Sequence, residues 1–212
     1  EEIAALEPDL ILFFETFEEP GTWELLSEIA PTVASSRPTF EMDWQDVTRE
    51  IGIAVGRAED ADTLVADVEA RIAEAAVDGE PSLAFAGVVS LDSLSVPKGE
   101  DDTARRLLRD LGFVEPPTYS EFGGDETAGA QELSTERLDL LDSDVLMLAF
   151  FDPSVRDDFE AQAVFQSVPA VADGRYLSVD LADIAPLRAP TPLALDHFID
   201  EVVPRITDLL PE

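Results

Sequence analysis

Residues 1–14 read EEIAALEPDLILFF, and residues 136–149 read ERLDLLDSDVLMLA. The two stretches align without a gap, so that Leu6 pairs with Leu141. Each copy combines the spacing of a short helix with an apolar run that is typical of a buried strand. Two copies are too few for a solenoid, which needs at least about three stacked repeats. The repeat therefore predicts two similar α/β lobes related by an approximate two-fold axis.

A weaker likeness follows each copy. Residues 30–33 read APTV and residues 168–171 read VPAV, and the two match after a shift of three residues. This second likeness supports the interpretation of two related lobes.

Strand and helix signals alternate along the chain. The expected strands are residues 10–14, 32–35, 83–89, the apolar end of the second copy, and 176–179. Helical patterns separate them, and this alternation is typical of mainly parallel sheets covered by helices. The predicted fold class is α/β, with two lobes joined by one long helix.

The connecting helix is expected over residues 59–79, where apolar residues recur at helical spacing. About twenty residues of helix span about 30 Å, which is long enough to connect two lobes. The expected organisation is the distal part of an amino-terminal lobe at 1–57, the connecting helix at 58–79 and a carboxy-terminal lobe at 80–212.

Several segments are expected to be irregular. These are residues 90–98, the Gly-rich residues 116–129, and residues 180–192, which carry three prolines. The last helix is expected over residues 193–210, with a kink at Pro204 because proline lacks a backbone donor.

The composition indicates a globular chain that avoids polyanionic partners. The chain has 212 residues, 45% of them hydrophobic, with 47 acidic and 13 basic residues and a formal net charge of −34. This charge repels nucleic-acid phosphates and anionic lipid head groups, so we expect no nucleic-acid partner. Adaptation to high salt, and an acidic secreted surface with biased codon usage, are two explanations of the acidity.

Residues for metal binding and catalysis are scarce. The absence of cysteine excludes disulfides, thiolate metal sites and cysteine nucleophiles. His197 is the single histidine, whereas direct zinc or manganese binding generally uses several. Neither a G-x-S-x-G nor a G-x-G-x-x-G motif occurs, and so many carboxylates make accidental pairs unavoidable. We therefore expect neither an enzyme nor an intrinsic metal or cofactor.

The amino terminus has no charged and apolar leader, and no run approaches the roughly 20 apolar residues of a membrane helix. The first residues already have a helical pattern. We expect that an upstream part with a signal or an anchor has been removed from a longer precursor.

Five phrases resemble a known family when they are taken together. They are EEIAALEPDLIL, LLSEIAPTV, IGIAVGR, LSTERLDLLDSDVLML and VPAVADGRYLSVD. Their order and spacing are similar to those of the ferric-siderophore and cobalamin class of ABC-transporter substrate-binding proteins, the helical-backbone class III. The likeness runs through nearly all of the chain, although the first part of the amino-terminal lobe looks absent.

The resemblance implies two lobes on one long helix, a ligand in the cleft between them and a membrane permease as docking partner. It also implies export to the periplasm or cell surface, with a lipid anchor in the full-length precursor. A monomer is expected.

The candidate ligand contacts lie in loops that follow strands. Open α/β sheets bind ligands beyond the carboxyl ends of their strands, so facing lobes present these loops to a shared crevice. Aromatic rings would cover the organic body of a chelate, and guanidinium groups would pair with its metal-bound oxygens. The candidates are Phe17, Arg37, Phe40, Phe122, Phe151 and Arg188.

The resemblance places Phe17 and Phe122 near aromatic contacts of related siderophore binders. Where some relatives carry aromatic residues in the last cleft loop, this chain has Ile184 and Pro186. Each candidate also has a structural alternative, because a phenylalanine at a strand end more often belongs to the core. The arginines can equally serve to neutralise neighbouring carboxylates.

Glu1 and Glu136 occupy equivalent positions of the repeat, at the starts of the two predicted helices. A carboxylate at this position favours the helix dipole. The resemblance implies a second use, since family members present one glutamate per lobe to arginines of the permease.

The ligand is expected to be an Fe(III)–siderophore complex. A triply anionic catecholate complex needs several convergent cations, and the cations outside the predicted helices are few: Arg37, Lys98, Arg175 and Arg188. Neutral or cationic hydroxamate chelates need fewer, so a hydroxamate is favoured. A cobalamin or haem ligand, or a non-transport acidic module for surface interactions, are the alternatives.

Overall fold

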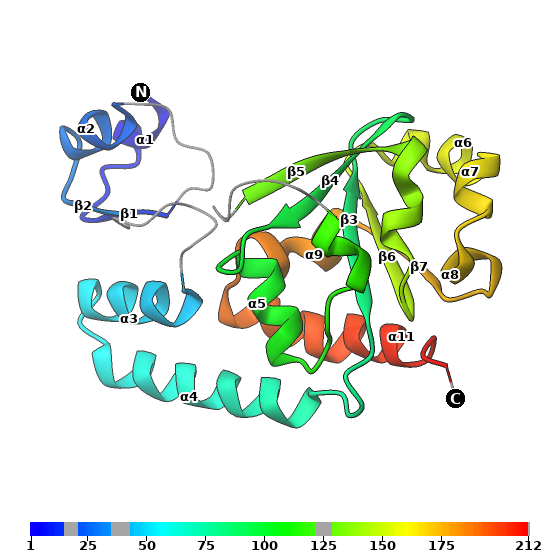
Figure 1. The fold of residues 1–212 in the computed structure, drawn as a ribbon. Helices are drawn as coiled ribbons and strands as arrows, with labels where there is room; N and C mark the ends of the chain where they lie inside the picture. Colours follow the sequence, from blue (N-terminus) through cyan, green and yellow to red (C-terminus); the bar gives the residue numbers. More distant parts are fainter. Residues whose placement is uncertain (15–20, 35–42, 122–128, 212) are drawn as a thin grey trace.

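The computed structural model describes residues 1–14, 21–34, 43–121 and 129–211. Two sheets form two lobes, a two-stranded sheet near the amino terminus and a five-stranded sheet in the larger carboxy-terminal lobe. A long helix runs along the base of the molecule and leads from one lobe to the other (Figure 1). The predicted α/β fold class with two lobes is therefore confirmed.

The amino-terminal lobe consists of short elements. They are α1 (Glu2–Ala5), β1 (Ile11–Phe13), α2 (Thr22–Ser27) and β2 (Thr32–Ala34). β1 and β2 pair in parallel, with Leu12 opposite Val33, and none of the six strand residues is buried. Among the described residues of the segment 1–34 only Leu26 and Ala30 are buried.

The carboxy-terminal sheet has the strand order β5-β4-β3-β6-β7. The strands are β3 (Leu83–Val88), β4 (Ser93–Lys98), β5 (Gly129–Ser134), β6 (Val145–Phe150) and β7 (Tyr176–Val179). The pairs β3–β6 and β6–β7 are parallel, as predicted, whereas β3–β4 and β4–β5 are antiparallel. The sheet is therefore parallel on one side and antiparallel on the other.

The prediction of an irregular segment at residues 90–98 is wrong, because β4 occupies most of it. Leu94 and Val96 are fully buried and alternate with serines, which is the pattern of a strand. Pro97 obscured this pattern, because proline cannot donate to a ladder. β3 pairs with β4 only at Gly87–Ser95 and Val88–Leu94, so Pro97 lies where β4 has already separated from β3.

Helices cover both faces of this sheet (Figure 1). One face packs against α4 (Ala58–Ala75), α5 (Thr103–Asp110) and the carboxy-terminal helices. The other face packs against η3 (Thr135–Leu141), α6 (Arg156–Glu160), α7 (Ala163–Gln166) and α8 (Pro169–Ala172). The helical segment that follows β6 is thus divided into two short helices, α6 and α7. In the second layer the fully buried ring of Phe159 lies between Phe150 and Phe165, at centroid distances of 5.8 and 5.4 Å.

The connecting helix α4 (Ala58–Ala75) is shorter than the predicted 59–79, because Ala76 is already extended. Its buried stripe, Ala61, Val65, Val68 and Ile72, follows the expected helical spacing. At 18 residues it is about 27 Å long. α4 also packs against α3 (Trp44–Ala54), where a Cβ added to Gly52 would lie 2.4 Å from the Cβ of Ala61.

The contacts of α4 tie it to the carboxy-terminal lobe. Val65, Val68 and Ile72 belong to the same buried cluster as the β3 and β6 side chains on that face of the sheet, and so does Trp44 of α3. Arg71 also forms ion pairs with Asp196 and Asp200 of the last helical segments. The lobe boundaries at residues 57/58 and 79/80 stay a prediction.

The prediction of a loop at residues 180–192 is wrong. Residues Leu181–Arg188 form α9, and the side chain of Asp180 caps it by accepting from the amide of Asp183 at 2.9 Å. Pro186 lies inside this helix, where it has no amide hydrogen to donate to the carbonyl four residues earlier. The last helix is also less regular than predicted. It runs as α10 (Pro192–His197), a π-helical turn η5 (Phe198–Val202) and α11 (Val203–Thr207). The wide turn precedes Pro204, which has no amide hydrogen.

The repeat is structural in its first part only. Both copies form a helical turn followed by a strand, α1 and β1 in one lobe, η3 and β6 in the other. The second likeness does not extend to structure, because residues 32–34 form a strand and residues 169–172 form a helix.

Candidate functional site

A cavity of about 410 Å³ opens in the carboxy-terminal lobe between the sheet and α9. At this place β4 leaves β3 after Ser95 and continues beside β5 alone, and Ser95 and Pro97 of β4 line the cavity. The lining combines apolar side chains with one cation. It includes Phe85, Phe151, Leu181, Ile184 and Arg188.

Phe151 owes its position to a glycine. It follows β6, and its amide donates to the carbonyl of Val88 at 3.1 Å. A Cβ added to Gly87 of β3 would lie 2.7 Å from the Phe151 ring, so only glycine lets the ring settle on the strand. The side chain is 49% exposed, which makes it available to a ligand rather than to the core.

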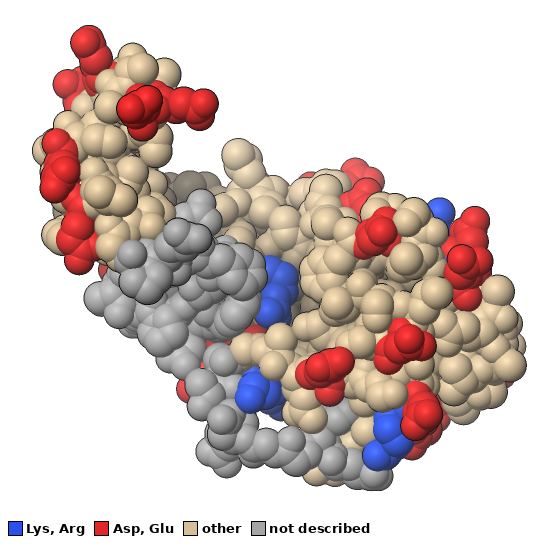
Figure 2. Space-filling view, turned by 90° about the horizontal axis from the view of Figure 1, so that it is seen from above, with Lys and Arg blue, Asp and Glu red and all other residues tan. Residues whose placement is uncertain are grey.

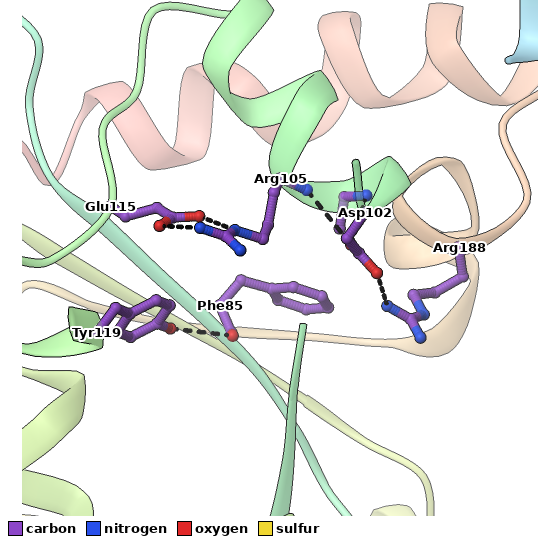
Figure 3. Close-up of polar contacts among 7 residues, drawn as sticks. Phe85, Asp102, Arg105, Glu115, Tyr119 and Arg188 are labelled. Atoms are coloured by element: carbon purple, nitrogen blue, oxygen red, sulfur yellow. Dashed lines mark hydrogen bonds and ion pairs between the residues drawn. The ribbon is translucent and has the colours of Figure 1, made fainter. Parts of the chain in front are cut away.

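Arg188 ends α9 and faces the start of α5 (Figure 3). Its Nη1 lies 3.6 Å from Oδ2 of Asp102, and its side chain is 25% exposed. Asp102 is fully buried, and its Oδ1 accepts from the amides of Ala104 and Arg105 at 2.9 and 3.4 Å. A buried carboxylate thus connects the amino terminus of α5 to the cation of the cavity.

The environment acts on both groups of this pair. Burial raises the pKa of the Asp102 carboxyl, and the charge of Arg188 and the amides of Ala104, Arg105 and Gly129 oppose that increase. Burial likewise lowers the pKa of the Arg188 guanidinium, and the charge of Asp102 opposes that decrease. Each group is therefore stabilised in its charged form by the other.

A second cavity, of about 340 Å³, adjoins the first and shares Phe85 and Pro97 with it. Arg105 and Glu115 form a two-pronged ion pair at its wall, and Tyr119 donates from its hydroxyl to the carbonyl of Phe85 at 3.3 Å (Figure 3). Burial raises the pKa of the Tyr119 hydroxyl, so the phenol stays protonated as this hydrogen bond requires.

The structure brings two of the sequence-predicted contacts together, since Phe151 and Arg188 line the same cavity. Ile184 lines it as well, at the place where the resemblance implies an aromatic residue in some relatives. Ligand contact by these residues stays a prediction. Four other candidates lie outside the described residues: Phe17, Arg37, Phe40 and Phe122.

The two glutamates of the repeat both lie at helix starts. Glu1 is the residue before α1, Glu136 lies in the first turn of η3, and both side chains are exposed. Their positions agree with a favourable helix-dipole contact and leave both carboxylates accessible.

Sequence reasoning missed Asp102 and Gly87. Asp102 precedes a helix in the pattern Asp-Thr-Ala, which is an N-cap signal, but nothing local shows that its second oxygen faces α9. Gly87 interrupts a strand of apolar residues, and an isolated glycine in a strand marks a close approach of another group.

Arg175, one of the cations considered for ligand binding, lies away from the cavity. Arg175 precedes β7 and donates to the carbonyls of Ser143 and Asp144, at the opposite end of the parallel strands from Phe151.

In Figure 2 the described surface of the amino-terminal lobe shows acidic and uncharged residues, and residues 1–34 contain no Lys or Arg. Among the described residues, no group of three or more potential metal ligands occurs.

Two α/β lobes with an apolar cavity at strand ends and a paired cation in it are typical of a binding protein for an organic solute. The periplasmic binding protein family has a model that matches residues 1–180, and the chain belongs to this family. No helix within the described segments has the length and hydropathy needed to cross a membrane.

Solved structures of similar fold include three with bound ligands. Streptococcus pneumoniae TIGR4 PiaA in complex with ferrichrome has a TM-score of 0.75 and 23% identity, and the match covers 98% of this chain and 71% of that one. Staphylococcus aureus SirA complexed with staphyloferrin B has a TM-score of 0.71 and 22% identity, with 97% and 74% covered.

Staphylococcus aureus FhuD2 with bound ferrioxamine B has a TM-score of 0.75 and 15% identity, and the match covers 98% of this chain and 79% of that one. At these identities the likeness is one of fold. No curated protein sequence matches the chain.

Proposed function

We propose that this chain is the substrate-binding component of an ABC importer, which captures a ferric siderophore in the cleft and delivers it to a membrane permease. The observation that carries the proposal is the cavity at the strand ends of the carboxy-terminal lobe, where Phe151 and Arg188 lie together. Membership of the periplasmic binding protein family supports it.

The lining suits a metal chelate with an organic body. Phe151, Leu181 and Ile184 offer apolar surface to the ligand's backbone, and Arg188 offers a cation to oxygens around the metal. At about 410 Å³ the cavity is within the range of small-molecule sites.

A hydroxamate chelate is the favoured class. Ferric catecholates carry three negative charges, whereas ferric trihydroxamates are neutral or cationic. Among the described lining residues Arg188 is the only cation, and it already faces Asp102. Similar structures contain ferrichrome and ferrioxamine B, both hydroxamates, and staphyloferrin B, which is not one.

The proposal includes further parts that follow from the family. Glu1 and Glu136 would present one carboxylate per lobe to arginines of the permease, and both side chains are exposed. The protein would act outside the cytoplasmic membrane as a lipid-anchored monomer without enzymatic activity. The lobe boundaries at 57/58 and 79/80 belong to the same proposal.

Titration of the purified chain with ferric chelates tests the proposal through quenching of the Trp23 and Trp44 fluorescence. We expect saturable quenching by ferrichrome or ferrioxamine B, and weaker quenching by haem and cobalamin. Phe151→Ala and Arg188→Gln should each reduce the affinity about tenfold or more.

The matched control is Arg57→Gln, which removes an exposed arginine paired with Asp60 at the start of α4, far from the cavity. It should leave the affinity unchanged. Absence of saturable quenching by any ferric chelate would contradict the proposal.

A further inference from the structure

We infer that Asp102 is the positioning residue of the cleft cation: it holds the Arg188 guanidinium at the cavity and cancels its charge, so that the cleft selects ferric chelates without net negative charge. This inference rests on the proposed function and names the substrate class by its charge.

The geometry of Asp102 suits this role. The residue precedes α5 and is fully buried, and its Oδ1 is occupied by the amides of Ala104 and Arg105. Its Oδ2 makes no hydrogen bond within the described part of the chain and lies 3.6 Å from Nη1 of Arg188. This distance allows charge attraction but exceeds that of a hydrogen bond. Asp102 therefore orients Arg188 without taking a hydrogen bond from it.

Several neighbouring groups oppose the effect of burial on the Asp102 carboxyl and favour its charged form. Two backbone amides point at one oxygen, the amino terminus of α5 contributes its positive dipole end, and a guanidinium faces the other oxygen. Opposite charges interact strongly where water is excluded. The two residues thus form a pair of zero net charge at the wall of the cavity.

Two other arginines have partners of their own. Arg105 is paired with Glu115 in the adjoining cavity, and Arg175 is bound to two carbonyls at the other end of the strands. Lys98 follows the lining residue Pro97 at the end of β4 and is not itself among the described residues that line the cavity. An anionic chelate would therefore lose its hydration without meeting a net positive charge, whereas a neutral chelate incurs a smaller loss.

The test is Asp102→Asn, because asparagine has nearly the same shape and also caps helices. Two probes are titrated into the full chain, ferrichrome, which is neutral, and ferric enterobactin, which carries three negative charges. We expect the ratio of the enterobactin affinity to the ferrichrome affinity to rise at least about tenfold, since Arg188 becomes an uncompensated cation. The double variant Asp102→Asn/Arg188→Gln should return the ratio to the wild-type value.

Asp101→Asn is the matched control, because it removes the same charge from an exposed neighbour. It should leave the ratio unchanged. Ferrichrome binding by the wild type with an unchanged ratio in Asp102→Asn overturns the inference and leaves the proposed function standing. Failure of the wild type to bind any ferric chelate overturns both.

A measurement without ligand tests the positioning itself. The urea midpoints of Asp102→Asn, Arg188→Gln and the double variant form a thermodynamic cycle. We expect the double variant to shift the midpoint less than the two single variants together. Additive shifts would show that Asp102 does not hold Arg188 and would overturn the inference.

Discussion

The two lobes begin with the same segment pattern and differ in what covers it. In the amino-terminal lobe, β1 and β2 leave every strand residue at least partly exposed. In the carboxy-terminal lobe, all six residues of β6 are buried between β3 and β7 and beneath helices on both faces. The two segments are alike in sequence. The difference in burial therefore comes from the strands and helices that pack around each one.

The same contrast extends to the cavities. The cavities of about 410 and 340 Å³ are both lined by residues of the carboxy-terminal lobe, where a large sheet holds Gly87 and Phe151 in fixed register. Strands and helices position ligand contacts more precisely than loops do.

The largest expected effect separates the stabilities of the two lobes. Phe159→Ala removes a fully buried ring that packs against Phe150 and Phe165, so we expect a loss of about 3–5 kcal/mol in the free energy of unfolding. Leu12→Ala in β1, where the side chain is 41% exposed, should cost less than about 1 kcal/mol. Urea denaturation followed by circular dichroism measures both, and equal losses would contradict the comparison.

A smaller effect concerns the site. Gly87→Ala places a methyl group against the Phe151 ring, so we expect a loss of stability of about 1–3 kcal/mol and a displaced ring. Affinity for ferrichrome should fall about tenfold, as in Phe151→Ala. Combining both substitutions should weaken binding no further than Phe151→Ala alone, and additive losses would show that Gly87 acts elsewhere.

The connecting helix allows a finer test of which lobe it belongs to. Val68→Ala removes a buried contact of α4 with the carboxy-terminal core and should cost about 1–2 kcal/mol. Leu64→Ala, on the same helix but 43% exposed, should cost less than about 0.5 kcal/mol. Hydrogen exchange of α4 amides should accelerate in the first variant only.

The smallest expected effect is pH-dependent. Burial favours the protonated form of Asp183, but hydrogen bonds from Arg205 and His197 outweigh this effect and lower the pKa of its carboxyl. A lowered pKa in the folded state adds stability above the unfolded-state value of about 3.9, and this stability is lost as the pH falls through the folded value.

Asp183→Asn should therefore lose less than about 1 kcal/mol near neutral pH and show a shallower acid limb below about pH 4. Thermal midpoints recorded between pH 3 and 7 measure this. Parallel curves for wild type and variant would assign the acid sensitivity to other carboxylates.

Much of the fold could be predicted from periodicity. The strands at residues 83–88, 145–150 and 176–179 and the stripe of α4 are continuous apolar patterns that local sequence specifies. β4 and α9 could not be predicted, because Pro97 and Pro186 disguise their patterns and tertiary neighbours stabilise them. Where a proline is tolerated depends on which backbone donors have partners, and that is a property of the assembled sheet.

Only part of the candidate site could be predicted from the sequence. Loops after strands pointed to Phe151 and Arg188, because parallel strands end at a common edge. The pairing of Arg188 with Asp102 joins residues far apart in sequence, and only the packing of α9 against α5 brings them together. Counting cations in the sequence therefore predicted a positive charge at the site, whereas in the folded chain Asp102 compensates the charge of Arg188.

The separation of β4 from β3 after Ser95 has an evolutionary consequence. The split between the two strands is a feature of main-chain pairing, so it can persist when the side chains that line the cavity change. Descendants of such a scaffold can exchange the lining and acquire a different cargo while the framework is inherited intact.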